Sequence, residues 1–174
     1  MLRALVVLAL IMLTACNDRP TLEQQKLSQD TLNLEEFFEG GVIAHGQFKD
    51  VLGNVSRRFV VEIDGVWDGS ILRLVEDFTY SDQTTEQRIW TLTKTGPDTW
   101  DGTAPGVLGT AKGTESGDTF NFKYTIDLPV DGKTTRVSFD DWMWKLSDNR
   151  VLNIAYMEKF GVKVGEVVIF FEKQ

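Results

Sequence analysis

Apolar and polar residues alternate along most of the chain after Gly41. The alternation is clearest over residues 120–128, where Phe, Phe, Tyr, Ile and Leu occupy every second position and mostly polar residues lie between them. A period of two places one face of a strand in a core and the other in water. The pattern predicts ten short strands, near residues 41–50, 54–64, 67–79, 85–95, 98–103, 107–115, 118–128, 133–146, 149–160 and 163–173.

Turn signals separate these strands, and no long helical segment lies between them. Asp131-Gly132 and Asp148-Asn149 connect successive strands as hairpin turns would. A parallel sheet needs long crossover connections, so we expect an antiparallel meander. Closure removes the free edges of a meander. The sequence therefore predicts an all-β domain that closes into a lipocalin-like β-barrel of about eight to ten strands, with a two-sheet sandwich as the alternative.

One short helix is expected before the first strand. Thr31 or Asn33 is a suitable N-cap, Leu34-Glu35-Glu36-Phe37-Phe38 supplies about one and a half turns with acidic residues near the positive end of the helix dipole, and Gly40-Gly41 ends it. An apolar helix this short, next to a predicted barrel, is expected to act as a lid or plug.

The N-terminus has the pattern of an export signal. Residues 1–15 combine a basic start with an apolar stretch well under the ~20 residues that span a bilayer. Leu13-Thr14-Ala15-Cys16 resembles the bacterial lipobox, which implies lipidation of Cys16. Asn17 follows where an aspartate would favour inner-membrane retention, so the resemblance implies the periplasmic face of the outer membrane. We expect a signal peptide over residues 1–15, a polar tether over 16–30 and the barrel domain over 31–174.

Composition excludes several other functions. The chain has 18 Lys and Arg against 26 Asp and Glu, a net charge of −8 without a basic run, so nucleic acid is not expected as a partner. It contains one Cys and one His, too few for a structural zinc site, an internal disulfide or a spare Cys–His catalytic pair. No cofactor or metal is expected.

A carboxylate on an apolar strand face is the first candidate for function. Glu76 shares its predicted face with Leu72, Leu74 and Phe78. Burial of a carboxylate without a partner costs several kcal/mol or forces protonation, so a basic side chain should meet it. Arg88 is the first candidate partner and Arg57 the second. The structural alternative is a buried ion pair that only fixes the strand register.

A run of acids and tryptophans is the second candidate. In Asp140-Asp141-Trp142-Met143-Trp144, neighbouring residues of a strand point to opposite faces, so one Asp must face the core and the two cannot form a dyad. Asp141 is expected to join an interior polar cluster, and the alternative is an aromatic belt that closes one sheet. The predicted ligand-binding residues are Glu76, Arg88, Arg57, Asp141, Trp90, Phe78, Tyr124 and Trp142.

Several segments together resemble a family of small Gram-negative lipoproteins classed as a domain of unknown function. The resemblance covers roughly residues 38–171 and rests on Arg57-Arg58-Phe59, Arg88-Ile89-Trp90 and above all Asp140-Asp141-Trp142-Met143, together with the lipobox. It implies no established activity. A weaker, architectural resemblance is to lipocalins, whose first strand carries Gly-x-Trp, where this chain has Gly46-Gln47-Phe48.

Three functional hypotheses follow. The first is a non-enzymatic lipoprotein, anchored to the membrane by its lipid, whose barrel binds an apolar, fatty-acyl or lipid-like molecule. The second is a structural or assembly partner that docks on another envelope protein through exposed aromatics around Trp142 and Trp144. The third is a hydrolase with Glu76 and Asp141 as acid and base.

Overall fold

All ten predicted strands are present in the computed structural model, which describes residues 21–130 and 132–174. In this part of the chain the helices are α2 (Leu22–Gln25) and α3 (Leu34–Phe38). The strands are β1 (Gly40–Asp50), β2 (Val55–Trp67), β3 (Ile71–Tyr80), β4 (Thr85–Gly96), β5 (Thr99–Thr103), β6 (Ala111–Ser116), β7 (Thr119–Val130), β8 (Lys133–Ser147), β9 (Arg150–Lys159) and β10 (Val162–Lys173). Two strands differ clearly from the prediction: β3 and β6 each begin four residues later, and before β6 Val107 makes a single bridge to Ile126.

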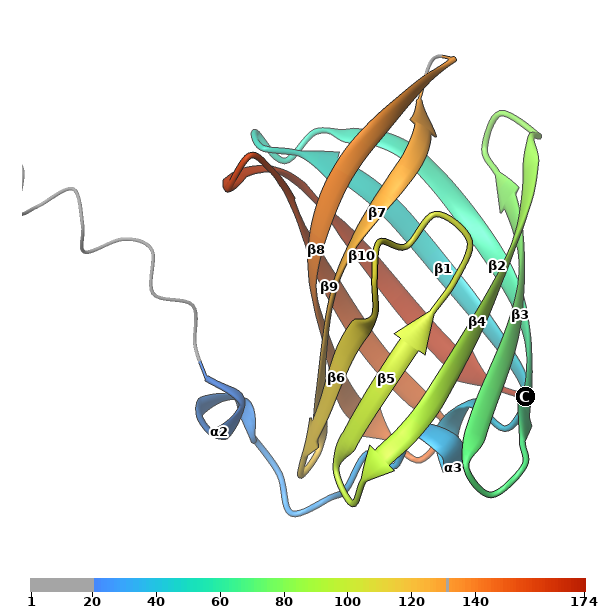
Figure 1. Ribbon diagram of the computed structural model, residues 1–174, viewed down its shortest axis with the longest axis vertical. Helices are drawn as coiled ribbons and strands as arrows, with labels where there is room; N and C mark the ends of the chain where they lie inside the picture. Colours follow the sequence, from blue (N-terminus) through green and yellow to red (C-terminus); the bar gives the residue numbers. More distant parts are fainter. Residues whose placement is uncertain (1–20, 131) are drawn as a thin grey trace, which may run out of the picture.

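The strands form one closed antiparallel barrel (Figure 1). Each strand pairs with its neighbours in sequence, and β1 pairs with β10 over nine residues, from Val42 opposite Lys173 to Asp50 opposite Gly165. This ring confirms the predicted barrel and excludes the two-sheet sandwich. Successive side chains of a strand point to opposite faces, so in a closed ring every second residue of a strand faces the interior.

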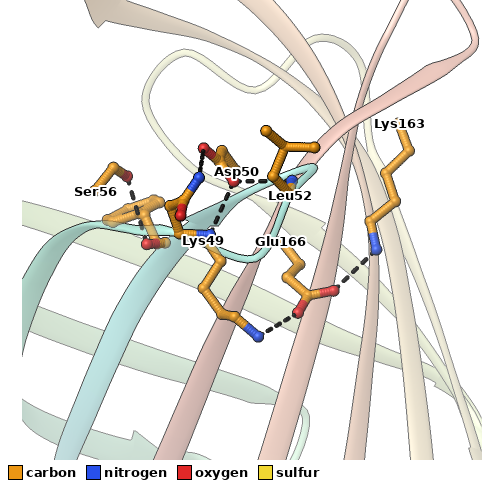
Figure 2. A network of polar contacts seen from close by, with 8 residues as sticks. Lys49, Asp50, Leu52, Ser56, Lys163 and Glu166 are labelled. Atoms are coloured by element: carbon orange, nitrogen blue, oxygen red, sulfur yellow. Dashed lines mark hydrogen bonds and ion pairs between the residues drawn. The ribbon is translucent and has the colours of Figure 1, made fainter.

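Polar contacts fasten the seam between β1 and β10 at one rim of the barrel (Figure 2). The Glu166 carboxylate accepts hydrogen bonds from Lys49 at 3.1 Å and from Lys163 at 2.9 Å, and so joins both seam strands. In the adjacent turn, Asp50 Oδ1 accepts the N–H groups of Leu52 and Asn54, each at 2.9 Å. These contacts order the turns beside the seam.

The α3 helix lies across the opposite end of the barrel, as expected of a plug (Figure 1). Leu34, Phe37 and Phe38 are buried. Asn33, one of the two expected residues, occupies the N-cap position, but its side chain makes no capping hydrogen bond. Instead, the Leu34 N–H donates to Glu115 on β6 at 2.8 Å. A carboxylate from the barrel wall therefore satisfies this free end of the helix.

The other end of α3 is held by Lys173, at the end of β10. Its ammonium donates hydrogen bonds to the carbonyl oxygens of Glu36, Phe37 and Glu39, at 2.9, 3.0 and 2.5 Å. A cation at a helix C-terminus binds its unpaired carbonyls and stabilises the dipole. The Phe38 ring also packs edge-on against a core ring of β10, with centroids 5.3 Å apart.

The segment before α3 corrects one expectation. A flexible polar tether was predicted over residues 16–30, but Gln25 and Leu27 within it, and Leu32 just after it, bond to the β6–β7 turn. Thr119 Oγ1 donates to the Gln25 carbonyl at 3.2 Å, the Leu27 N–H donates to Asp118 at 3.2 Å, and the Leu32 N–H donates to the Gly117 carbonyl at 2.8 Å.

The predicted signal peptide and Cys16 lie outside the described residues. Among residues 21–130 and 132–174, no helix is both long enough and apolar enough to cross a bilayer.

The fit of the plug can be tested at Gly65. A Cβ there would overlap the carbonyl oxygen of Phe38, whereas a Cβ at Gly41, another strand glycine, would meet only the Gln174 side chain at 3.6 Å. We expect Gly65→Ala to lower the free energy of unfolding by roughly 1–3 kcal/mol, the range for overpacking, and Gly41→Ala to change it by less than ~0.5 kcal/mol. Urea unfolding of the two variants measures both. Equal effects would show that α3 does not press on β2.

Candidate functional site

The barrel encloses a narrow, mostly apolar cavity of about 140 Å³. Its lining extends from Leu34 and Phe38 of the plug to Phe48 and Leu128, which lie toward the opposite rim. The walls between them carry aromatic and aliphatic side chains from nearly every strand. The cavity thus follows the barrel axis instead of forming a side pocket.

Five polar side chains, the polar belt, interrupt this apolar lining. They are Glu76 on β3, Arg88 on β4, Tyr124 on β7, Asp141 on β8 and Asn153 on β9. In the ring of ten strands, β3 and β8 are five positions apart. The belt therefore has one half on the β3–β4 wall and another on the β8–β9 wall across the cavity.

On the first wall, Arg88 lies directly opposite Glu76 in the β3–β4 register, as the sequence predicts. Its guanidinium, however, donates to Glu86 at 2.7 Å, and the second oxygen of Glu86 accepts the Tyr80 hydroxyl at 2.8 Å. Within the described chain the Glu76 carboxyl has no hydrogen bond and no ion pair within 4 Å. Glu76 feels the charge of Arg88 without direct contact.

On the second wall, Asp141 and Asn153 form a pair. The Asn153 amide nitrogen donates to an Asp141 carboxylate oxygen, and also to the Trp142 carbonyl at 2.9 Å. Because both partners are acceptors, the amide orientation is determined: nitrogen toward them, oxygen away. The Asn153 Oδ1 atom is buried and has no hydrogen-bond partner in the described structure, although the residue is only 1% exposed.

Burial shifts the protonation of this belt. Desolvation raises the pKa of Glu76 to about 7; Arg88 opposes the shift, and the charges of Asp141 and Glu86 add to it. Desolvation also raises the pKa of Asp141 to about 7, against the hydrogen bond from Asn153 and with a contribution from Asp140. The pKa of Tyr124 is raised well above its usual value by burial and by Asp141. Both carboxyls can therefore gain or lose a proton near neutral pH.

Six of the eight predicted ligand-binding residues line the cavity: Glu76, Phe78, Arg88, Trp90, Tyr124 and Asp141. Trp142 does not, which corrects that prediction. Asp141 faces inward, so Trp142, the next residue on β8, faces outward, where its ring stacks on Trp144 with centroids 6.2 Å apart. Asp140 is likewise on the outer face and accepts a hydrogen bond from Asn121 at 2.8 Å.

Arg57 is the second correction. It does not reach Glu76, because it lies near the start of β2, at the rim. Its guanidinium carbon sits 3.5 Å from the centroid of the Tyr80 ring, and it forms an ion pair with Asp82 at 2.8 Å. Arg57 therefore belongs to the rim and not to the belt.

Asn153 and Glu86 were not among the predicted site residues. Asn153 alternates with Val151 and Ala155, so an amide on an apolar strand face was the available signal. Glu86 shares a face with Arg88 two residues later, which signals a local competitor for the guanidinium. Within residues 21–130 and 132–174, no three His, Cys, Asp or Glu side chains are grouped so as to hold a metal ion.

Comparison with known proteins assigns the family. The chain belongs to the DUF3833 family, described as a protein of unknown function, whose model matches residues 10–173. No curated protein matches the chain.

Two solved structures are similar. The S-type phycobiliprotein lyase CPES from Guillardia theta is 11% identical, with a TM-score of 0.58 over 82% of this chain and 94% of that one. A redesigned β-barrel is 12% identical, with a TM-score of 0.43 over 80% and 94%. At this level of identity the first similarity supports the lipocalin-like barrel fold and nothing about activity.

The raised pKa of Glu76 makes a prediction about stability. The folded chain binds this proton more tightly than the unfolded chain, so ionisation of Glu76 lowers the free energy of unfolding as pH rises from about 4.5 to about 7. Glu76→Gln removes this loss. We expect the variant to match the wild type near pH 4.5 and to exceed it at pH 8 by on the order of 3 kcal/mol, from ~1.4 kcal/mol per pKa unit.

Urea unfolding at several pH values measures the difference. Asp77→Asn is the matched control, because Asp77 neighbours Glu76 but is exposed on the outer face, and we expect no comparable trend. A pH-independent destabilisation by Glu76→Gln would show instead that the carboxylate is needed as a counter-charge for Arg88.

Proposed function

We propose that this protein is a non-enzymatic binding protein that holds part of an apolar, lipid-like molecule inside its barrel. The observation that supports this is the apolar cavity with a polar belt at mid-height, since ligand sites typically combine apolar walls with a few polar groups that orient the ligand. The family match supplies no activity, so the proposal rests on the site itself.

The size of the cavity limits what it holds. An apolar cavity of about 150 Å³ accommodates a ring the size of benzene, and this one measures about 140 Å³. A chain segment of about six methylenes would gain roughly 5 kcal/mol by burial, at ~0.8 kcal/mol each. Micromolar affinity needs about 8 kcal/mol. The polar belt must therefore contribute the remainder, or the cavity must widen around a longer chain.

A binding role fits this geometry better than hydrolysis. Glu76 and Asp141 have the raised pKa values of acid–base groups, but they lie inside a narrow apolar channel. A glycosidase-type site needs an open cleft that takes a sugar and a water between its carboxyls. The two carboxyls are therefore assigned to ligand binding.

The proposed location is the periplasmic face of the outer membrane, with Cys16 as the lipid anchor. The support is the sequence pattern of residues 1–17. Several acyl chains on one cysteine would make the attachment effectively permanent, whereas a single chain would not.

The alternative role, docking on an envelope protein, was predicted to use exposed aromatics around Trp142 and Trp144, but Trp144 is half-buried. Trp142 is only 4% exposed, although it lies on the outer face. Exposed apolar side chains gather instead on two turns at the rim opposite α3, which adjoin because β1 pairs with β10. They are Val51, Leu52, Phe160 and Val162, with Phe160 at 96% exposure. Docking, if it occurs, would use this rim.

Replacement of Cys16 tests the proposed location. We expect Cys16→Ser to remove incorporation of radiolabelled palmitate and to release the protein from the membrane fraction of a Gram-negative host. Unchanged fractionation of the variant would contradict the anchor.

Ligand binding is tested with a neutral probe, 8-bromooctan-1-ol. Of the five tryptophans of the chain, Trp90 lines the cavity, so a bound bromoalkyl chain should quench the part of the tryptophan fluorescence that comes from Trp90. Ala44→Phe places a ring inside the cavity, and we expect it to weaken saturable quenching at least tenfold. The matched control is His45→Phe, the same side chain on the outer face of the next position.

The full chain is used in detergent micelles, and the control variant corrects for probe dissolved in the micelle. Ala44→Leu is a smaller replacement that keeps the test valid if the Phe variant does not fold. Identical quenching curves for wild type, the Ala44 variants and His45→Phe would refute binding in the barrel.

A further inference from the structure

We propose that the polar end of the ligand is a protonated amine, held between Glu76 and Asp141, and not a carboxylate. This inference rests on the proposed function and specifies the ligand class for the same cavity. It follows from the balance of charge and of hydrogen-bond acceptors in the polar belt.

The charges around the cavity do not cancel. Once Glu76 and Asp141 are ionised, above about pH 7, three carboxylates act on the belt, those of Glu76, Glu86 and Asp141, against the guanidinium of Arg88. Arg88 is drawn toward Glu86 by a 2.7 Å ion pair. Arg57, the next cation, is paired with Asp82 at the rim. A ligand carboxylate would add a fourth negative charge, whereas an ammonium group would reduce the imbalance.

The hydrogen-bonding groups of the belt independently favour a positively charged ligand. The Asn153 Oδ1 acceptor is buried against the cavity without a partner, and the Asn153 nitrogen is already used by Asp141 and the Trp142 carbonyl. The Glu76 carboxyl also has no hydrogen-bond partner in the described structure. An ammonium group carries three donors and no acceptor, so it matches these unpaired acceptors. A carboxylate does not.

Other charged groups near the belt do not change this result. Asp140 faces outward from β8, yet its charge acts on Asp141 in the same direction as the other carboxyls. Lys123 approaches Asp140 at 4.0 Å on the outer face, outside the cavity. Tyr124 is neutral near pH 7, since its pKa is raised. The interior thus favours a cation.

The test compares three probes that share an eight-carbon bromoalkyl chain and differ in their polar end group: 8-bromooctylamine, 8-bromooctan-1-ol and 8-bromooctanoic acid. Each probe is titrated into the full protein chain in micelles. The saturable quenching of tryptophan fluorescence is then compared between the wild type and Ala44→Phe. At pH 8 we expect the amine to bind at least tenfold more tightly than the acid. Amine affinity should rise about tenfold from pH 5.5 to pH 8, as the two carboxyls ionise, while alcohol affinity stays constant.

The variant Glu76→Gln/Asp141→Asn separates charge from shape. We expect the amine and the alcohol to bind this variant with equal affinity, and the pH dependence of amine binding to disappear. Acid binding equal to or tighter than amine binding in the wild type would overturn the amine assignment, while the binding function would stand. If no probe distinguishes the wild type from Ala44→Phe, the binding function fails and the assignment fails with it.

Discussion

The pairing of β1 with β10 is the constraint on which the rest of the structure depends. Once the ring is closed, the register of each strand decides which residues face inward, and a shift of one residue reverses both faces. In this register Glu76 shares the inner face with its β4 partner Arg88, and Asp141 shares it with its β9 partner Ala155. No free edge lets either strand rotate its carboxyl into water. The cost of burying these groups is therefore imposed by the closure of the barrel.

Closure of the ring and closure of its end are physically linked. Lys173, near the end of the strand that completes the ring, is also the residue whose ammonium holds the C-terminal carbonyls of α3. Glu115 holds the other end of the helix from β6, four positions away around the ring. The plug is thus fastened from well-separated parts of the wall.

The sequence predicted the strands, the short helix and the inward position of Glu76, because these follow from a period of two and a pair of glycines. It could not predict that Arg57 lies at the rim, since that depends on how far each strand is staggered around the barrel. Nor could it show that Glu86 would take the Arg88 guanidinium, which depends on side-chain conformation. Trp142 was a different error: Asp141 and Trp142 are neighbours in one strand, so the same alternation already excluded that both face the ligand.

The two interior carboxyls differ in what they contribute to the fold. Asp141 accepts a hydrogen bond from Asn153 and so links β8 to β9, which accounts for part of its presence. Glu76 makes no such link, because Arg88 is bonded elsewhere, and a buried ion pair that fixes register is therefore not formed at this position. A carboxyl that is desolvated in the folded state, with no hydrogen bond or ion pair among the described residues, is typical of functional sites, where stability is given up for binding. Of the two carboxyls, Glu76 is therefore the one whose position the fold explains less, and the proposed ligand is placed against it for this reason.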